Sequence, residues 1–387
     1  MRDESDRLVA GDLPVDPEAD AAPFETESRK AARLTLEGLS VAAAGASLTN
    51  RRLCADRSFF AWPGGHTGAP TTATQLPAGA LYQEPRNSQP DWPHLARMAG
   101  PLSPDRLIVV VGHTNRGKSA WALQVAHSAA TRRAPVLYMS CEMGTAELAA
   151  RLVALHAIGD QDKYKHGVPH RAVKNGGANK EELAEALQSL QEQAPALYLW
   201  APGPKARTPE ALREISTLVW KQHGKAPLIV VDYLQRLADG PDRRTAVLEL
   251  SGCLRDLARD DGGGDMPEGW PGACVVALST AARPNYKALD SVENLRKASR
   301  GEFENVTLEG MAKESGEVEA DADLVLVLTS NKGEGMAPRE ALIAVAKVRG
   351  GGNQGTVRMR FVPACGRWEE EGIQGFHAEA LNKGAPT

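Results

Sequence analysis

The residues that could most directly carry out chemistry lie in the stretch 106–119, which reads RLIVVVGHTNRGKS. A run of β-favouring residues leads into Gly112, and Gly117, Lys118 and Ser119 follow at the spacing of a phosphate-binding loop. Backbone N–H groups of such a loop wrap an anion, and the N-terminus of the following helix adds the positive end of its dipole. The stretch therefore predicts a site for the phosphates of a nucleotide.

Two positions of this loop have side chains with an expected role. Lys118 would reach the β- and γ-phosphates of ATP, and the Ser119 hydroxyl would bind Mg²⁺. The alternative is a chance match, but the helical periodicity of residues 120–130 supplies the strand, loop and helix that the motif needs. The predicted nucleotide-binding residues are Gly112, His113, Thr114, Asn115, Arg116, Gly117, Lys118 and Ser119.

Two carboxylates follow apolar runs that are typical of strands. Asp232 ends LIVV, and Glu142 comes shortly after PVLYMS. Ligands of an open α/β sheet gather at the C-terminal ends of its strands. There Asp232 would hold Mg²⁺ and its waters, and Glu142 would be the general base for the water that attacks the γ-phosphate. Each could instead be a solvated strand end, but a phosphate loop on the same sheet edge favours the catalytic interpretation.

Lys347 and Arg349 alternate at the end of AVAKVRG, which places both side chains on one face of a strand. Aimed at a phosphate, they would stabilise charge in the transition state, as an arginine finger with a lysine beside it. From the pattern alone, an exposed basic strand end is the simpler interpretation. His166 and His170 are four residues apart, but a glycine and a proline lie between them, so we predict surface histidines and not a helical metal pair.

Composition limits the class of protein. A chain of 387 residues can bury a sizeable core, and a net charge of −4 means that any nucleic-acid contact must be local. The five cysteines are scattered without a CxxC pair, which argues against a disulfide framework or a zinc ribbon. The acidic N-terminus does not resemble a signal peptide, and no apolar run approaches the roughly 20 residues of a membrane span. We therefore predict a cytoplasmic protein that makes no contact with a membrane.

Helical and strand patterns alternate from Pro101 onward, which predicts an α/β fold with a mostly parallel sheet, helices on both faces and a C-terminal β-hairpin. The predicted strands are 107–111, 135–140, 196–200, 228–231, 273–279 and 324–329, and the hairpin comprises 341–347 and 356–362. The predicted helices are 120–130, 145–158, 181–193, 209–223 and 243–260, with a short one near 291–298. Thr145 and Thr208 are the expected N-caps, Gly224 is an expected stop, and 159–180 is expected to be a loop.

The composition changes before residue 92. Residues 1–25 are rich in acidic residues, proline and alanine, and we predict that they are disordered. Residues 26–91 form a short segment that becomes rich in proline and glycine, with a single helix predicted over 26–47. One large domain is expected at 92–370, followed by a flexible tail at 371–387.

Taken in order, several segments resemble the RecA-like ATPase domain of the DnaB-type replicative helicases: GHTNRGKS, SCEM, LIVVDYLQ, VVALSTAARP, KESGEVEADADLVLVL and AKVRGGGNQGTVRMRF. The resemblance covers roughly residues 92–370. Its most specific parts are Asp-Tyr-Leu-Gln after one strand and Glu-Ala-Asp-Ala-Asp before the next. The fold that it implies is a RecA-like P-loop NTPase.

The resemblance implies a ring, usually a hexamer, with ATP bound between neighbouring subunits. Asp232 would be the Walker B carboxylate and Glu142 the catalytic base, while Lys347 and Arg349 would act on the nucleotide of a neighbour. The family's helical N-terminal domain, which forms a collar and binds the primase, has no counterpart in residues 1–91. A different protein partner of that segment is the expectation that follows.

The same resemblance implies a DNA-binding loop that contains Lys313, Glu314 and Gly316 and lines the central channel of the ring. Lysine and backbone amides suit that role, because phosphate contacts bind single-stranded DNA without reading its sequence. Lys313 stands where the family prefers arginine. Ser279 and Thr280 are the implied sensor residues, and Thr280 replaces a glutamine of the family, which would weaken coupling between the nucleotide and the DNA loops.

Three classes of function agree with these features. The first is an ATP-driven motor on single-stranded DNA, a hexameric DNA helicase or an accessory version of one. The second is a RecA-like or KaiC-like ATPase that loads or regulates a partner in recombination, mobile-element or defence functions. Thr280 and the missing collar favour this second class, whereas the KESG and AKVR segments favour the first. A scaffold that binds ATP without hydrolysing it would need neither Glu142 nor Asp232.

Overall fold

The computed structural model describes residues 92–100, 102–157, 168–175, 177–237, 243–259, 266–282, 285–302, 308, 311, 316–333, 335–350 and 352–371. The segments predicted at 1–25 and 26–91 lie outside these residues, as does the predicted tail after Glu371. The strands are β1 (Arg106–Gly112), β2 (Val136–Ser140), β3 (Leu197–Trp200), β4 (Leu228–Asp232), β5 (Cys274–Thr280), β6 (Leu324–Ser330), β7 (Arg339–Val348), β8 (Gly355–Val362) and β9 (Arg367–Glu370).

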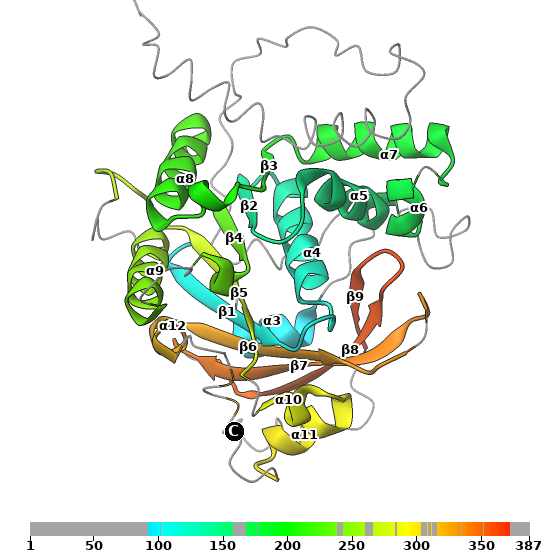
Figure 1. The fold of residues 1–387 in the computed structure, drawn as a ribbon, viewed down its shortest axis with the longest axis vertical. Helices are drawn as coiled ribbons and strands as arrows, with labels where there is room; N and C mark the ends of the chain where they lie inside the picture. Colours follow the sequence, from blue (N-terminus) through cyan, green and yellow to red (C-terminus); the bar gives the residue numbers. More distant parts are fainter. Residues whose placement is uncertain are drawn as a thin grey trace, which may run out of the picture.

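Within the described part, these strands form one sheet in the order β3-β2-β4-β5-β1-β6-β7-β8-β9 (Figure 1). Strands β1 to β6 are parallel, and β7, β8 and β9 follow antiparallel at one edge. The C-terminal ends of the parallel strands consequently meet at one edge, where ligands of open α/β sheets bind. The mostly parallel α/β architecture that the sequence predicts is confirmed.

The helices are α3 (Pro93–Ala99), α4 (Lys118–Thr131), α5 (Thr145–His156), α6 (His170–Asn175), α7 (Lys180–Gln193), α8 (Pro209–His223), α9 (Arg243–Ala258), α10 (Tyr286–Leu289), α11 (Val292–Ser299) and α12 (Gly316–Asp321). They cover both faces of the sheet. Ile108 and Val110 of β1 pack with residues of α4, α5 and α7, whereas Val109 and Val111 pack with α8, α9 and α11 (Figure 1). Side chains of a strand alternate between faces, so β1, which is buried on both, is apolar from Leu107 to Val111.

Local sequence signals predict some boundaries correctly and miss others. Helix α8 begins at Pro209 with Thr208 as its N-cap, whose hydroxyl accepts from the Ala211 N–H at 3.2 Å, and it ends before Gly224. Thr145, in contrast, is the first residue of α5, and Gly144 is the N-cap. The prediction of a loop over 159–180 was wrong in part, because α6 lies within it.

The sequence pattern missed two elements, α3 and β9, which are joined by hydrogen bonds. The Trp92 indole before α3 donates to the Trp368 carbonyl of β9, and the Glu370 carboxylate accepts the backbone N–H groups of His94 and Leu95. These partners are about 275 residues apart in the chain. Neither segment is long or periodic enough to predict its structure alone, so tertiary contacts decide it.

Candidate nucleotide-binding site

The predicted phosphate loop connects β1 to α4. Gly117 takes a left-handed conformation (φ 91°), and Lys118 begins the helix. A Cβ at Gly117 would lie 2.8 Å from Cζ2 of Trp368, whose indole N–H donates to the Gly117 carbonyl at 3.2 Å. Backbone conformation and the close ring both require glycine here. Gln124 of α4 forms two hydrogen bonds with the Trp368 backbone, so β9 supports the loop from outside.

Lys118 brings a buried positive charge into this loop. Its ammonium donates to the carbonyls of Gly112 at 2.8 Å and His113 at 3.1 Å. Burial lowers the pKa of Lys118 to about 8, against the opposing influence of the Asp232 and Glu142 carboxylates. The charged form still predominates at neutral pH. Two neutral carbonyls do not neutralise that charge, and a phosphate group would.

Asp232 and Ser119, predicted as Mg²⁺ ligands, lie together. Asp232 ends β4 opposite Ser140 of β2 and is buried. Burial raises the pKa of its carboxyl, while hydrogen bonds from Ser119 and Tyr138 lower it. A hydroxyl beside a carboxylate supplies the hard oxygen ligands that Mg²⁺ takes, so the residues present fit this ion.

Glu142 lies on the bend that follows β2 and is exposed. The Cys141 N–H donates to the Asp232 carbonyl, and the Met143 N–H donates to the Ser140 hydroxyl at 2.9 Å, so both sides of Glu142 are fixed. The Glu142 carboxylate raises the pKa of both Lys118 and Asp232. Glu142 therefore lies close enough to both groups to act on them electrostatically.

The two residues of the predicted sensor also reach this edge. Ser279 and Thr280 of β5 lie opposite Val111 and Gly112 at the start of the phosphate loop. Gln235 holds both of them: its amide donates to the Ser279 hydroxyl at 2.8 Å and accepts the Thr280 N–H at 3.3 Å. The sequence pattern assigned no role to Gln235, although it ends the family-specific Asp-Tyr-Leu-Gln segment.

Comparisons with known proteins agree with this geometry. Residues 89–267 match the family model of the DnaB-like helicase C-terminal domain. The chain is 29% identical to the replicative DNA helicase DnaB of Pasteurella multocida, over 59% of this chain and 43% of that protein. With DnaB of Leifsonia xyli it shares 29% identity over 69% of this chain and 52% of that protein. Residues 89–267 therefore resemble a DnaB-type C-terminal domain.

Solved structures extend the likeness beyond the matched segment. One of them, a solved ATPase domain, superimposes with a TM-score of 0.54 at 20% identity, over 72% of this chain and 89% of that one. A DnaB-like replicative helicase gives a TM-score of 0.53 at 18% identity, over 76% and 61%. The predicted RecA-like fold is confirmed. The chain spans about half the length of the curated DnaB relatives that it matches.

Lys347 and Arg349, the predicted finger pair, do not lie beside the other predicted site residues. Lys347 lies opposite Val325 near the start of β6, whereas Gly112 lies opposite Leu328. Three residues along a strand separate these levels by roughly 10 Å. Both cations instead bind the C-terminal end of α12: Lys347 donates to the carbonyls of residues 319 and 320, and Arg349 to those of 320 and 321.

The remaining predictions concern the DNA loop and the histidines. Lys313 and Glu314 lie outside the described residues, and Gly316 begins α12. His166 is also outside them. His170, predicted as a surface histidine, is partly exposed, and its Nδ1 lies 2.9 Å from the Ala364 carbonyl oxygen. Among the described residues, no group of three or more His, Cys, Asp or Glu side chains that could hold a metal ion occurs, and no helix could span a membrane.

Tyr138 is a further residue of this site that we did not predict. Its hydroxyl donates to Oδ2 of Asp232 at 2.8 Å from within the core. A tyrosine in the otherwise apolar strand run PVLYMS was the available signal, since a buried hydroxyl needs a partner. The hydrogen bond favours the charged form of Asp232.

Replacing Tyr138 by phenylalanine should weaken Mg²⁺ binding more at acid pH than at alkaline pH. Losing the donor raises the pKa of Asp232 further above its usual value, and protons then compete with Mg²⁺ as the pH falls. The Mg²⁺ concentration that half-saturates nucleotide binding should rise by up to about tenfold as the pH falls, and by more at pH 6 than at pH 8. Tyr198→Phe, which removes a similar hydroxyl from the neighbouring β3, is the control. Equal shifts at both pH values would contradict this account.

Proposed function

We propose that this chain is an ATP-hydrolysing motor that moves along single-stranded DNA as a ring, with a DnaB-like hexameric helicase as the reference. The observation that carries the proposal is the meeting of Lys118, Ser119 and Asp232 at one sheet edge, inside a domain of the DnaB type. On this proposal the ATPase domain is 92–370. Residues 1–91 and 371–387 would be attached segments, the first binding a protein partner.

The described side chains suggest how hydrolysis would proceed. Backbone N–H groups of residues 112–119 would hold the triphosphate, and Lys118 would neutralise charge on its β- and γ-phosphates. Mg²⁺ held through Ser119 and Asp232 would add further positive charge against the phosphates. Glu142 would orient the attacking water and accept its proton. Ser279 and Thr280, held by Gln235, would register the state of the nucleotide at the adjacent strand end.

The position of the predicted finger residues supports a ring. Lys347 and Arg349 lie toward the start of β6, whereas the phosphate loop follows the C-terminal end of β1, so they do not reach the phosphate loop of their own chain. A head-to-tail interface that repeats into a closed ring would present them to a neighbour's nucleotide. The Arg349 side chain is 46% exposed, so it is accessible for such a contact.

Binding of single-stranded DNA would fall to Lys313, Glu314 and Gly316. Gly316 begins α12, and the C-terminal end of that helix is held by Lys347 and Arg349. An interfacial pair that contacts both a neighbour's nucleotide and this helix would link hydrolysis to movement of the DNA loop. Thr280 is the feature that favours the alternative, a regulatory or loader ATPase, because a shorter side chain at the sensor would couple less to DNA.

The test is steady-state ATP hydrolysis with and without single-stranded DNA. Single strands should stimulate turnover by roughly fivefold or more, and a forked duplex should be unwound. Lys118→Ala is the control and should abolish both activities. Turnover that DNA leaves unchanged would reject the motor in favour of the regulatory ATPase, and wild-type turnover by Lys118→Ala would reject the phosphate-loop assignment.

A further inference from the structure

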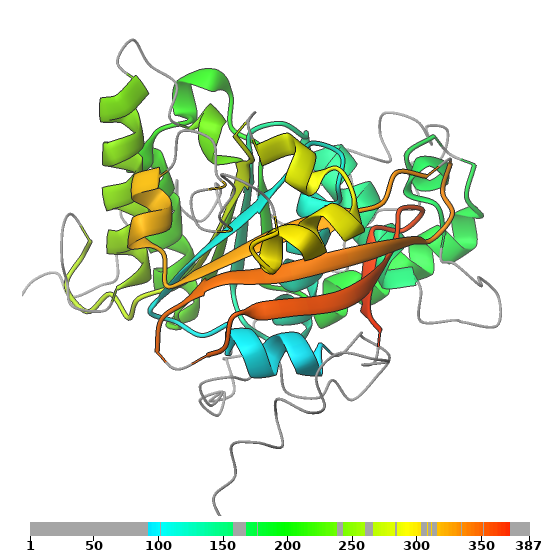
Figure 2. The same cartoon turned by 90° about the horizontal axis from the view of Figure 1, so that it is seen from below.

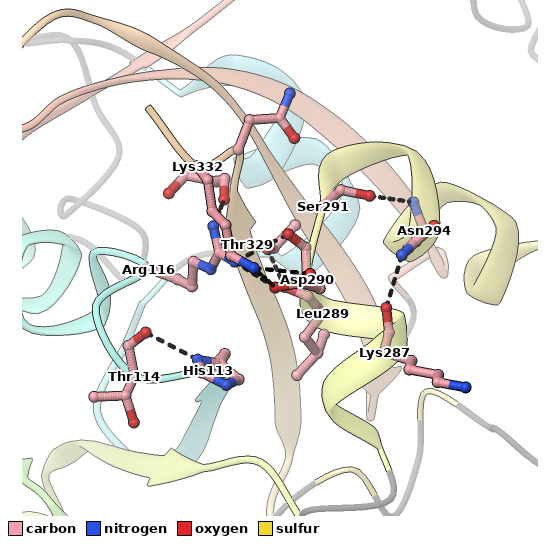
Figure 3. A network of polar contacts seen from close by, with 12 residues as sticks. His113, Thr114, Arg116, Lys287, Leu289, Asp290, Ser291, Asn294, Thr329 and Lys332 are labelled. Carbon is pink, nitrogen blue, oxygen red and sulfur yellow. Dashed lines mark hydrogen bonds and ion pairs between the residues drawn. The ribbon is translucent and has the colours of Figure 1, made fainter. Parts of the chain in front are cut away.

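Arg116 lies within the phosphate loop, and its side chain points toward Asp290 (Figure 3). The side chain is only 5% exposed. Its guanidinium donates to the Ser330 carbonyl at 2.6 Å, and to the carbonyl and a carboxylate oxygen of Asp290 at 2.9 and 2.8 Å. Three oriented acceptors for one buried guanidinium fix the position of this side chain.

Asp290 stands between the helices α10 and α11 and takes a second cation, Lys332, at 2.7 Å. Two further bonds fasten the same junction to the end of β6. The Thr329 hydroxyl donates to the Leu289 carbonyl at 2.6 Å (Figure 3). The Val292 N–H donates to the Asn331 side chain at 2.9 Å. The helix pair α10–α11 consequently lies against β6 and β7 and is tied there to the phosphate loop (Figure 2).

A second contact joins the loop to the helix pair. The His113 ring meets Tyr286, the first residue of α10, edge to face at a centroid distance of 4.3 Å. Thus both side chains that flank Thr114 and Asn115 reach the same helix pair. Any shift of the loop when it closes on phosphates must therefore move these helices or break their contacts.

In the chain, the helix pair connects the sensor strand to the predicted DNA loop. Strand β5, which ends in the sensor residues, leads through Ala281 to α10, and α11 leads toward the segment that contains Lys313. The ion pair between Arg116 and Asp290 joins the phosphate loop to the junction of α10 and α11. Without the Asp290 carboxylate, the buried Arg116 charge would keep only the carbonyls of Ser330 and Asp290 among these acceptors, so the guanidinium would be held less firmly.

We propose that Arg116 is a positioning residue that couples nucleotide binding in the phosphate loop to the helix pair α10–α11, with Asp290 as its receiving group. The proposal rests on the proposed function and adds to it a path from the nucleotide to the DNA loop. Arg116 would act through the loop backbone and the helices, because its guanidinium is bound to Ser330 and Asp290.

The test uses Asp290→Asn in the full chain, with Glu293→Gln as the matched control. Glu293 lies on the same helix pair and forms an exposed ion pair with Arg296, so its replacement removes an equal charge without touching the loop. Hydrogen–deuterium exchange of residues 286–299 is measured with and without a non-hydrolysable ATP analogue and Mg²⁺. Binding of a fluorescent ATP analogue is measured in parallel.

In the wild type and in Glu293→Gln, the analogue should slow exchange of these residues by roughly fivefold or more. In Asp290→Asn that protection should be lost, while analogue affinity and basal hydrolysis stay within about twofold and stimulation by single-stranded DNA disappears. Arg116→Lys should restore only part of the protection, because a lysine cannot make the forked contact.

The outcomes separate the two proposals. Binding of the analogue without protection of 286–299 in the wild type, or unchanged protection in Asp290→Asn, would overturn the coupling while leaving the nucleotide site intact. Failure of the wild type to bind the analogue would overturn the nucleotide site and the coupling with it.

Discussion

Replacing Glu142 by glutamine is expected to stop ATP hydrolysis while ATP binding continues. The amide is nearly isosteric with the carboxylate but accepts no proton from the attacking water. Loss of a general base lowers turnover by roughly 100-fold to 10,000-fold. Binding should change little, because Lys118, Ser119 and Asp232 remain in place, and an exposed carboxylate on a bend supports no core packing.

Single-turnover hydrolysis beside equilibrium binding of a fluorescent ATP analogue checks this expectation. Glu147→Gln is the matched control, since Glu147 lies five residues further on, in α5, where it pairs with Arg151 and Lys174. A normal rate for Glu142→Gln would remove this residue as the base. Loss of binding together with hydrolysis would mean that it positions the loop instead.

Replacing Arg349 by alanine should lower turnover by roughly 1,000-fold or more, as loss of an arginine finger does. Arg349 follows the end of β7, beside the start of β6 and away from the phosphate loop of its own chain. It would therefore complete only the site of a neighbouring subunit. Binding of ATP to the phosphate loop of the same chain should persist. The expected defect is therefore in the rate of hydrolysis and not in affinity.

A mixing experiment separates action in trans from a structural role. Lys118→Ala and Arg349→Ala are each inactive, yet a ring that contains both places an intact phosphate loop beside an intact finger at about a quarter of its interfaces. Turnover should rise when the two variants are mixed and rings are allowed to exchange subunits. A mixture as inactive as its parts, in rings shown to exchange, would refute action in trans. Arg349 would then serve only to hold α12.

The sequence by itself determined which segments form the strands and helices next to the nucleotide site, and their order along the chain. Its signals there are local: an apolar run makes a buried strand, Thr208 and Pro209 begin a helix, and glycine allows the left-handed turn before Lys118. It also placed Glu142 and Asp232 correctly at strand ends, because parallel strands bring those ends to one edge. Their roles in catalysis stay predictions.

Only the tertiary structure decided which side chains support that edge. Tyr138 reaches Asp232 from the next strand, and Trp368 reaches Gly117 across about 250 residues, contacts that no periodicity encodes. The direction of Arg116, out of the loop and onto Asp290, depends on helices formed about 170 residues later. The register of β7 against β6 set Lys347 and Arg349 away from their own phosphate loop. Local sequence patterns determine individual strands and helices, whereas these side-chain contacts depend on how strands and helices that are distant in the chain pack together.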